Sequence, residues 1–403
     1  MRIAIVSQEY PPLTAYTGGI GRMYSTLAPA LARAGQQVEV ITITRDEPRT
    51  LEHDGAVVHL VRRPTPDRLW FVDALPWSHA VDRALRRLGR FDVVFAPEWF
   101  GEAALYSRHR RSGPLATELT TSLDQILELV PDWQRTRRMR VRHSLQRRLE
   151  RSQAERSDAI MASSRAIGRW ASELWNIGDT PGVVLGNMVD IDRIRSMADG
   201  ELPDGFPADD PVVAFTGRLE LRKGVHLLVD AMNDVWARHP DAQLVMLGRD
   251  GDWDGGRMSD ELRRRAGSSA ARLHILGNQP PERLYPALAA ADVVAMPSLW
   301  ENFALGSLEV LALGRPLVAT SGSGYDDYMV SGANGVLVPP RDVPALAEAI
   351  DELLGDPSLR ERLSRGAAER VEEMRIEPVT ARHVEFFEQV ASGTVPQTLS
   401  EAI

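Results

Sequence analysis

The chain has 403 residues, of which 43% are hydrophobic and 26% are charged, and its net charge is −9. This length is too great for one ordinary core and predicts two domains of about 200 residues each. The net charge excludes a general nucleic-acid binder. The absence of cysteine excludes disulfides, thiolate zinc sites and a cysteine nucleophile. Because no apolar run approaches the ~20 residues that span a bilayer, and the first residues lack a signal-peptide pattern, we expect a cytoplasmic protein.

The first half alternates buried-strand patterns with helical patterns. An apolar run at 3–6 is followed by Gly18-Gly19-Ile20-Gly21, and apolar residues then recur at helical spacing over 23–31. The glycines do not fit G-x-G-x-x-G, which disfavours a dinucleotide-binding loop. Further strands are predicted at 38–44, 57–61, 92–96, 115–119 and 159–162. This order of strands and helices predicts an α/β class protein with a doubly wound parallel sheet.

The second half repeats the same rhythm. The predicted strands are 212–215, 243–247, 272–276, 293–296 and 316–320. A stretch rich in proline, aspartate and glycine at 201–211 is predicted to be a surface loop, and 187–190 a hinge between the domains. A helix is expected over 377–390, with frayed residues after it.

The most informative segment is 297–309, PSLWENFALGSLE, which connects a predicted strand to a predicted helix. Such a junction offers free backbone amides and the positive end of a helix dipole to an anion. The amides of Phe303, Ala304 and Leu305 are therefore predicted to face a diphosphate and its sugar. Glu309 would bind ribose hydroxyls and Glu301 the transferred sugar. The alternative is a pair of solvated surface glutamates.

This segment resembles the E-x7-E signature of the retaining glycosyltransferases of family 4, of the "glycosyl transferases group 1" type. The resemblance covers most of the chain. Phe215-Thr216-Gly217-Arg218-Leu219 with Lys223 resembles the family's Arg/Lys pair, Gly18-Gly19 its phosphate-facing loop, and 161–164 and 186–190 its interdomain strand and hinge. The resemblance implies the GT-B fold, in which two Rossmann-like, doubly wound domains face each other across a cleft.

The resemblance also implies that the two domains bind different substrates. We expect an acceptor-binding domain at 1–188, with a C-terminal helix at about 377–403 packing back on it, and a nucleotide-sugar-binding domain at 189–376. Two fixed cations would stabilise the charge that grows on the leaving diphosphate. The residues expected to bind the donor are Gly18, Gly19, Gly217, Arg218, Lys223, Gly248, Asn302, Phe303, Ala304, Leu305 and Glu309.

One position departs from the family pattern. A histidine that touches the reacting sugar is common after the fifth strand of the first domain, but Thr120 stands there. Thr120 can donate a hydrogen bond to a sugar hydroxyl but cannot act as a general base. Glu98 is expected to orient the acceptor, although an ordinary loop carboxylate fits its position equally well. The expected catalytic residues are therefore Arg218, Lys223, Glu301, Thr120 and Glu98.

The acceptor is expected to meet a set of acidic and aromatic residues near strand ends of the first domain. If these carboxylates line the site, a cationic acceptor such as an amino-sugar or an aminocyclitol fits them. The expected acceptor-binding residues are Glu9, Tyr10, Glu98, Trp99, Glu118 and Asp124.

Two further patterns are open to more than one interpretation. Residues 250–261 match an EF-hand calcium loop, but a strand precedes them and Arg257 replaces an apolar residue, so we expect no metal. Nine arginines lie between 135 and 156 and are expected to spread around a helix. We favour a solvated helix over a surface that binds anionic lipid.

These patterns together predict a metal-independent, retaining glycosyltransferase without a cofactor. Its co-substrate would be a nucleotide sugar, UDP-linked before GDP- or ADP-linked, and its acceptor a small soluble molecule. The alternatives are a lipid acceptor, a sugar-nucleotide epimerase of the same fold, and a non-catalytic sugar-nucleotide-binding partner.

Overall fold

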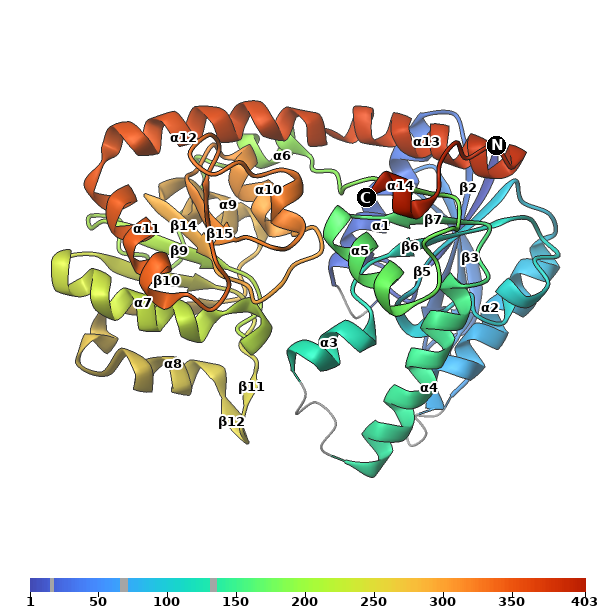
Figure 1. Cartoon of the computed structure of the whole chain (residues 1–403), viewed down its shortest axis with the longest axis horizontal. Coiled ribbons are helices and arrows are strands. Elements are labelled where there is room, and N and C mark those ends of the chain that lie inside the picture. Colours follow the sequence, from blue (N-terminus) through green and yellow to red (C-terminus); the bar gives the residue numbers. More distant parts are fainter. Residues whose placement is uncertain (15–17, 66–71, 131–135) are drawn as a thin grey trace. The chain divides into compact units, whose positions relative to one another are not determined.

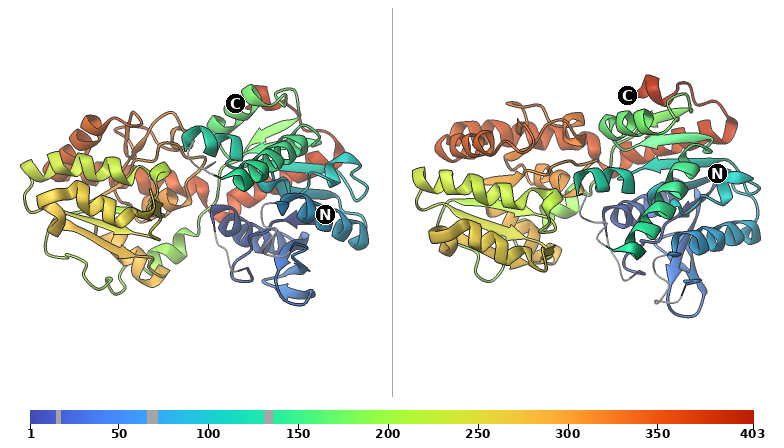
Figure 2. Two further views of the ribbon diagram at one scale, coloured as in Figure 1. Left: turned by 90° about the horizontal axis from the view of Figure 1, so that it is seen from below. Right: turned by 60° about the horizontal axis from the view of Figure 1, so that its bottom comes forward.

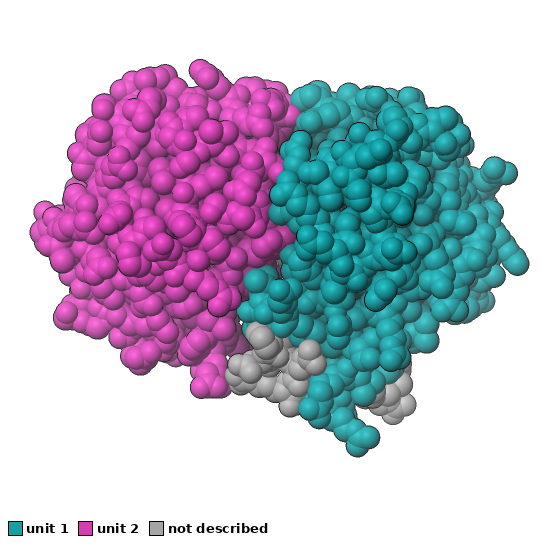
Figure 3. All heavy atoms as spheres, in the orientation of Figure 1, with its two compact units in different colours: residues 1–188, 376–403 teal, residues 189–375 magenta. Residues whose placement is uncertain are grey.

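The computed structural model describes residues 1–14, 18–65, 72–130 and 136–403. They form two compact units, which Figure 3 shows in different colours. Unit 1 comprises Met1–Met188 and Ile376–Ile403, and unit 2 comprises Val189–Arg375.

Unit 1 is built on an eight-stranded sheet of order β3-β4-β2-β1-β5-β6-β7-β8, in which only β3 runs antiparallel to its neighbour. Every residue of β5, β6 and β7 is buried, as expected of parallel strands covered on both faces. The strands are β1 Arg2–Val6, β2 Gln37–Thr44, β3 Arg49–His53, β4 Ala56–Arg62, β5 Val93–Pro97, β6 Leu115–Leu119, β7 Ala159–Ala162 and β8 Gly182–Val184.

Helices cover both faces of this sheet (Figures 1 and 2). On one face α13 packs beside α1, and Phe387 of α13 lies edge-to-face against Phe95 of β5 with ring centroids 5.0 Å apart. On the other face α2 and α4 bury residues such as Trp77 and Leu149. The helices are α1 Gly19–Arg33, α2 Ala74–Leu88, α3 Leu123–Leu129, α4 Arg137–Ala154, α5 Arg165–Leu174, α13 Ile376–Ser392 and α14 Leu399–Ala402.

The prediction that the last residues fray is wrong. They form α14, which begins at a capping box in which Thr398 and Glu401 satisfy each other's backbone amides. Leu399 is fully buried, and its backbone amide donates to Thr180 O at 2.8 Å. The segment is ordered because it buries an apolar side chain against unit 1.

Unit 2 contains a six-stranded, all-parallel sheet of order β13-β10-β9-β14-β15-β16. One face packs against α7, α8 and α11, and the other against α6, α9 and α10. The strands are β9 Val212–Thr216, β10 Gln243–Leu247, β13 Leu273–Gly277, β14 Val293–Met296, β15 Leu317–Thr320 and β16 Val336–Val338, with a hairpin of β11 Asp252–Trp253 and β12 Gly256–Arg257. The helices are α6 Ile191–Ser196, α7 Val225–Arg238, α8 Met258–Ala266, α9 Pro281–Ala290, α10 Leu305–Ala312, α11 Val343–Gly355 and α12 Pro357–Arg370.

Every strand predicted from an apolar run is present, within a residue or two of its predicted bounds. The strands that the sequence did not predict are β3, β8, β11, β12 and β16. Two of these have three residues and two have two, and β3 is largely exposed, so none carries a long apolar run.

Candidate active site

The strand order of unit 2 reverses between β9 and β14, since the chain continues to β10 on one side and to β15 on the other. Open α/β sheets bind ligands outside the carboxyl ends of the strands at such a switch point. The loop after β9 carries Arg218 and Lys223, and the loop after β14 carries Glu301. The topology therefore brings the predicted cations and the first predicted glutamate to one edge of the sheet.

Lys223 and Glu301 form the centre of a buried charge cluster. Lys223 Nζ donates to Glu301 Oε1, and Ser298 Oγ donates to the same oxygen at 2.9 Å. Arg222 Nη1 lies 3.7 Å from it, and the three charged side chains are only 8–15% exposed. Burial alone would raise the pKa of Glu301, but the charges of Lys223 and Arg222 lower it below its usual range. Glu301 is therefore ionised. The sequence reasoning missed Arg222 and Ser298.

Lys223 is the only lysine among the 47 lysines and arginines of the chain. An ammonium is a compact point charge, whereas a guanidinium is a planar fork. All the other basic residues among these 47 are arginines, and the single lysine lies next to Arg222, which already supplies a guanidinium. This contrast is visible in the sequence and is a second signal for Lys223, beside its place in the Arg/Lys pair that the sequence analysis predicted.

Glu309 lies in α10, whose start supplies the predicted anion site. Ala304 is the N-cap residue of this helix, and no side chain of the N-cap accepts a hydrogen bond from the first turn. The backbone amides of an uncapped helix start can donate hydrogen bonds to an anion. Glu309 is 4% exposed and accepts a hydrogen bond from Tyr285 Oη at 3.3 Å. Phe303 packs on Tyr328 with ring centroids 4.6 Å apart. The segment 302–305 is thus fixed by packing at the helix start.

Two glycines are required by close backbone approach at this edge. A Cβ on Gly248, which has φ 155°, would lie 1.9 Å from the carbonyl oxygen of Gly217 at the end of β9. A Cβ on Gly324 would lie 1.3 Å from the carbonyl oxygen of Asn302. Gly324 N also donates to Glu301 O at 2.8 Å, so the loop after β15 supports the Glu301 loop.

Arg218 stands apart from the cluster. Its side chain is 51% exposed and pairs with Glu220 at 3.3 Å. The structure thus brings Lys223 together with Glu301 but leaves Arg218 on the surface of the same loop.

In unit 1 the strand order reverses between β1 and β5. The loop after β5 carries Glu98 and the end of β6 leads into Thr120. Glu98 Oε2 accepts hydrogen bonds from Thr120 N at 2.7 Å and from Thr120 Oγ1 at 3.0 Å. These two predicted residues are therefore a bonded pair at the carboxyl edge of the sheet.

Glu9 has a different role from the predicted one. Its Oε2 accepts from Gly18 N at 2.7 Å and from Gly21 N at 3.3 Å, at the start of α1. A carboxylate of the chain itself thus stabilises the positive end of the helix dipole. In this structure the Gly18 amide therefore donates to Glu9, and the expected contact of the Gly18-Gly19 loop with a donor phosphate stays a prediction. Space beside Gly19 is open.

Two further predicted acceptor contacts are corrected by burial and pairing. Tyr10 is 0% exposed and lies in the core, edge-to-face with His53. Asp124 forms an ion pair with Arg147 and accepts from Trp175 Nε1 at 3.3 Å. Neither side chain is available to a ligand, since each is engaged within unit 1. Trp99 is half-buried beside α2.

Buried carboxyl groups gather beneath this edge. Glu118 accepts from Ser163 Oγ at 3.1 Å, and burial raises its pKa to about 7. Glu102 bonds to Trp77 Nε1 and Gln8 N, and burial raises its pKa to about 8. Glu150 of α4 accepts from Phe100 N and Leu123 N, with its pKa raised by burial to about 7. The sequence reasoning missed Glu102 and Glu150, which tie these loops to the strands and to α4.

These carboxyls predict that stability falls as pH rises from 6.5 to 8. Below its folded-state pKa each is neutral in the folded protein and ionised in the unfolded chain, so deprotonation favours unfolding by up to ~1.4 kcal/mol per pH unit and group. This fall ends near pH 7 for Glu118 and Glu150 and continues to about pH 8 for Glu102. Buried His383, with its pKa lowered by burial to about 4, opposes this trend only below pH 6.5. We expect the midpoint of thermal unfolding to fall over this range and Glu102→Gln to flatten the fall. An unchanged slope in Glu102→Gln would contradict the assignment.

In the segment 250–261, which matches a calcium-loop pattern, the acidic side chains bind other residues of the chain. Asp250 accepts from Ser259 N at 3.0 Å and from Ser259 Oγ at 2.7 Å, and Glu261 pairs with Arg264 and Arg265. Within the described ranges, no group of three or more histidine, aspartate or glutamate side chains is placed to hold a metal ion.

The arginines of α4 lie outside one buried side of the helix. His143, Gln146, Glu150 and Gln153 form its buried side, because they recur at intervals of three and four. The exposed arginines of this helix are Arg137, Arg138, Arg140, Arg147, Arg148 and Arg151, and Arg142 is half-buried. Arg147 and Arg151 pair with Asp124 and Glu155, whereas Arg137, Arg140 and Arg148 have no ion pair within the described ranges. Asp132 and Arg135 lie outside the described residues.

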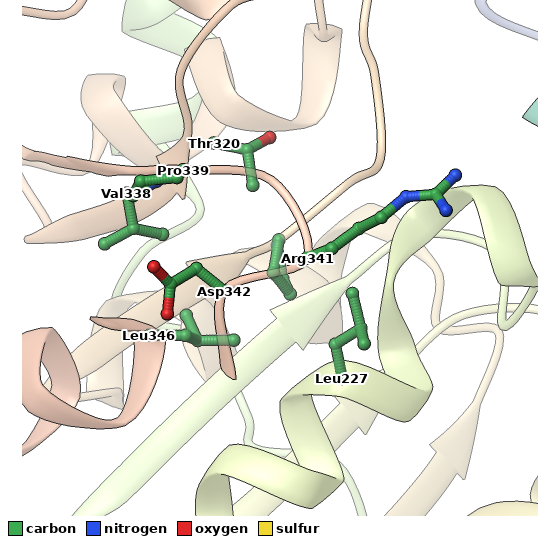
Figure 4. A pocket seen from close by; sticks show the side chains of 8 residues that line it. Leu227, Thr320, Val338, Pro339, Arg341, Asp342 and Leu346 are labelled. Atoms are coloured by element: carbon green, nitrogen blue, oxygen red, sulfur yellow. The ribbon is translucent and has the colours of Figure 1, made fainter. Parts of the chain in front are cut away.

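A small pocket in unit 2 lies at the ends of β15 and β16 (Figure 4). Its walls are mainly apolar, from Leu227, Val338 and Leu346, and Arg341 extends beside it. Asp342 in the wall accepts from Ala345 N at 3.0 Å and so caps α11. This pocket lacks the paired charges of the Lys223–Glu301 cluster. Elsewhere, none of the helices in the described part of the chain has the length and apolarity to cross a membrane.

Two α/β units, each with a largely parallel sheet and with predicted site residues at its carboxyl edge, match the GT-B fold, and solved structures share this fold. Sucrose-phosphate synthase from Thermosynechococcus elongatus superposes with a TM-score of 0.78 at 24% identity, covering 97% of this chain and 99% of that one. Anabaena HepE in complex with UDP and glucose gives 0.72 at 18% identity, covering 96% and 100%.

Sequence comparisons identify the family. Residues 17–193 match the model described as Glycosyltransferase Family 4, and residues 203–370 that described as Glycosyl transferases group 1. Glycogen synthase of Mycobacterium tuberculosis is 31% identical over 92% of this chain and 90% of its own length. Phosphatidyl-myo-inositol mannosyltransferase of Mycolicibacterium smegmatis is 28% identical over 96% and 94%. The chain belongs to the family 4 glycosyltransferases.

Proposed function

We propose that this enzyme transfers a sugar, with retention of anomeric configuration, from a nucleoside diphosphate sugar bound by unit 2. The observation that carries the proposal is the buried Lys223–Glu301 cluster at the switch point, together with the uncapped start of α10. A UDP-linked donor is favoured because the structural neighbour HepE holds UDP and glucose.

Breaking the bond between the sugar and the diphosphate requires positive charge and hydrogen-bond donors beside the leaving group. When the bond between the anomeric carbon and the phosphate oxygen breaks, negative charge grows on the leaving diphosphate. The ammonium of Lys223 and the amides at the start of α10 stabilise that charge in the transition state. We propose that the acceptor oxygen attacks from the same face and that its proton passes to the leaving phosphate oxygen. This route requires neither a general base from the chain nor a resident metal ion.

We further propose that the acceptor is a small soluble molecule rich in hydroxyl groups. The expected attraction of a cationic acceptor by carboxylates loses its support, because burial raises the pKa of Glu98 and Glu118 and favours their neutral forms. A neutral carboxyl attracts no cation by charge.

A panel of nucleotides and sugar nucleotides tests the donor assignment. We expect UDP to raise the midpoint of thermal unfolding by several degrees, since a ligand at 100 times its Kd stabilises the folded state by about 2.7 kcal/mol. The sugar nucleotide with the largest shift should be hydrolysed slowly without an acceptor. If UDP causes no shift and GDP or ADP does, the UDP assignment is wrong; if none does, the function is wrong.

A lipid acceptor is the second candidate, favoured by the exposed arginine side of α4. Arginines near anionic lipid contribute about 1 kcal/mol each, and the attraction is screened by salt. Val141, at 48% exposure, is the large apolar side chain exposed on this helix, which offers little to insert into a bilayer.

Vesicle flotation separates the two acceptors. We expect the protein to float with vesicles containing anionic lipid at low salt and to be released at about 0.15 M salt, because a few exposed arginines without an apolar face bind weakly. Neutral vesicles are the control. Flotation that persists at 0.15 M salt, and that Arg140→Glu with Arg148→Glu abolishes, would replace the soluble acceptor by a lipid.

A further inference from the structure

The loop that follows β5 is bonded to the buried side of α4. Gln153 accepts a hydrogen bond from Ala103 N at 2.8 Å and donates one to Pro97 O at 2.8 Å. One turn earlier in the helix, Glu150 Oε1 accepts from Phe100 N at 3.0 Å. Three backbone groups of this loop are therefore held by two side chains of one helix.

The backbone conformation of this loop needs that support. Phe100 has φ 67° and ψ −1°, in the left-handed region that bulky residues rarely occupy. A Cβ on Gly101 would lie 2.4 Å from Leu149 Cβ and 3.0 Å from Glu150 N, so the loop backbone lies directly on α4. Strained residues persist only where the surrounding contacts hold them, and they cluster at functional sites.

Glu150 also holds a second loop. Its Oε2 accepts from Leu123 N at 2.9 Å, where the loop after β6 enters α3, and Gln146 Nε2 donates to Oε1 at 2.7 Å. The Glu150 side chain is 0% exposed. The loops after β5 and β6 both leave the carboxyl edge of the sheet, next to the switch point between β1 and β5. One buried carboxyl thus fixes two loops at the edge where such sheets bind ligands.

The bonds from the two loops do not depend on the charge of Glu150. Burial raises its pKa to about 7, so both forms are populated near neutral pH. The ionised carboxylate accepts all three hydrogen bonds. In the neutral form the proton on Oε1 is donated to the side-chain oxygen of Gln146 once that amide flips, and both carboxyl oxygens still accept from the backbone amides.

We propose that Glu150 is a positioning residue, which holds the loops after β5 and β6 in the geometry that places the acceptor oxygen for attack. Glu150 itself touches no substrate. The side chains whose directions it fixes are Glu98 and Trp99, which lie between two of the bonded backbone groups of the first loop. This inference rests on the proposed function and deepens it. A displacement of about 1 Å in a reacting group can lower a rate about 100-fold, so such support has a measurable effect on turnover.

Glu150→Gln tests the proposal with a side chain of nearly the same shape. An amide nitrogen cannot accept a hydrogen bond, so the glutamine faces either Phe100 N or Leu123 N with a donor and loses that bond at any pH. With UDP-glucose as the probe, kcat for hydrolysis, in which water replaces the acceptor, should fall about tenfold or more. The KM for UDP-glucose should stay within about threefold of the wild type, and the thermal shift by UDP should be kept, because the donor is bound by unit 2.

Hydrogen exchange measures the two bonds without substrate. In Glu150→Gln the amide of Phe100 or of Leu123 should exchange about tenfold faster or more, while the strands of unit 2 keep their rates. Asp158→Asn is the matched control, since Asp158 Oδ2 accepts from Leu115 N at 2.8 Å at the opposite, amino edge of the same sheet. It should leave the exchange of both loop amides unchanged and kcat within about threefold of the wild type.

A second variant covers the case in which Glu150→Gln does not fold. Gln153→Met keeps the volume of the side chain and removes its bonds to Pro97 O and Ala103 N. It should lower kcat with an unchanged KM in the same way.

Each contrary result overturns a defined part of the proposal. Wild-type kcat together with faster exchange would show that Glu150 supports the fold but does not position the acceptor. Unchanged exchange of both amides would show that Glu150 does not hold the loops. An equal loss of kcat in Asp158→Asn would assign the effect to general destabilisation. If the wild type shows neither a UDP shift nor hydrolysis, the proposed function fails instead, and the exchange rates still decide whether Glu150 holds the loops.

Discussion

Lys223→Ala is expected to lower turnover about 100-fold or more, because it removes a fixed charge from the site where the leaving diphosphate accumulates charge. It also leaves the buried Glu301 carboxylate with Arg222 at 3.7 Å as its remaining charged partner. The pKa of Glu301 should rise as a result, so more of it is protonated at low pH, which adds a loss of activity toward lower pH. Steady-state hydrolysis and transfer, measured at pH 6 and pH 8, check both effects.

Lys223→Arg tests whether the site needs an ammonium rather than any cation. The guanidinium would have to share a position that is 15% exposed with Arg222 and Glu301, so we expect about tenfold or greater loss despite the conserved charge. Arg263→Ala, on the exposed surface of α8, is the matched control for losing a cation. Since Lys223 is the only lysine, an amine reagent should label it and the N-terminus alone, and UDP should protect it. Full activity of both Lys223 variants would refute the proposal that Lys223 stabilises the leaving diphosphate.

Arg218→Ala was expected from the sequence to match Lys223→Ala, but the structure exposes half of the Arg218 side chain. We still expect a loss of about 100-fold if Arg218 turns to the diphosphate once a donor is bound. A loss limited to a few-fold would instead assign the charge stabilisation to Lys223 and Arg222.

Glu301→Gln and Glu309→Gln should separate sugar recognition from nucleotide recognition. Glu301→Gln leaves two buried cations beside a neutral amide, so UDP binding should be retained while binding and turnover of the sugar nucleotide fall by about 100-fold. Glu309→Gln should weaken free UDP itself, because we expect the carboxylate to accept hydrogen bonds from ribose hydroxyls. Titration calorimetry with UDP and with the sugar nucleotide measures the split.

Tyr285→Phe serves as a graded control for Glu309. It removes the hydroxyl that donates to Glu309 Oε1 and leaves the carboxylate in place, so UDP affinity should fall less than in Glu309→Gln. Equal losses of free UDP affinity in Glu301→Gln and Glu309→Gln would contradict the division of roles.

The sequence by itself determined the architecture of the two sheets. Continuous apolar runs such as 293–296 indicated strands buried on both faces, and β14 occupies those four residues. It also placed Lys223 and Glu301 in loops that follow predicted strands of the second domain. That these strands, β9 and β14, are neighbours in the sheet is shown only by the structure, because strand order depends on contacts between distant segments.

Only the tertiary structure decided what the acidic residues of unit 1 do. Glu9, Glu98 and Asp124 look alike in sequence, yet one caps α1, one holds Thr120 and one pairs with Arg147. The same is true of the α4 arginines, whose shared direction follows from the buried polar side of that helix. Hydrogen-bond partners, burial and therefore pKa are set by residues distant in the chain, such as Glu150 beneath the Phe100 loop. A carboxylate's role depends on these long-range contacts, which the linear pattern does not contain.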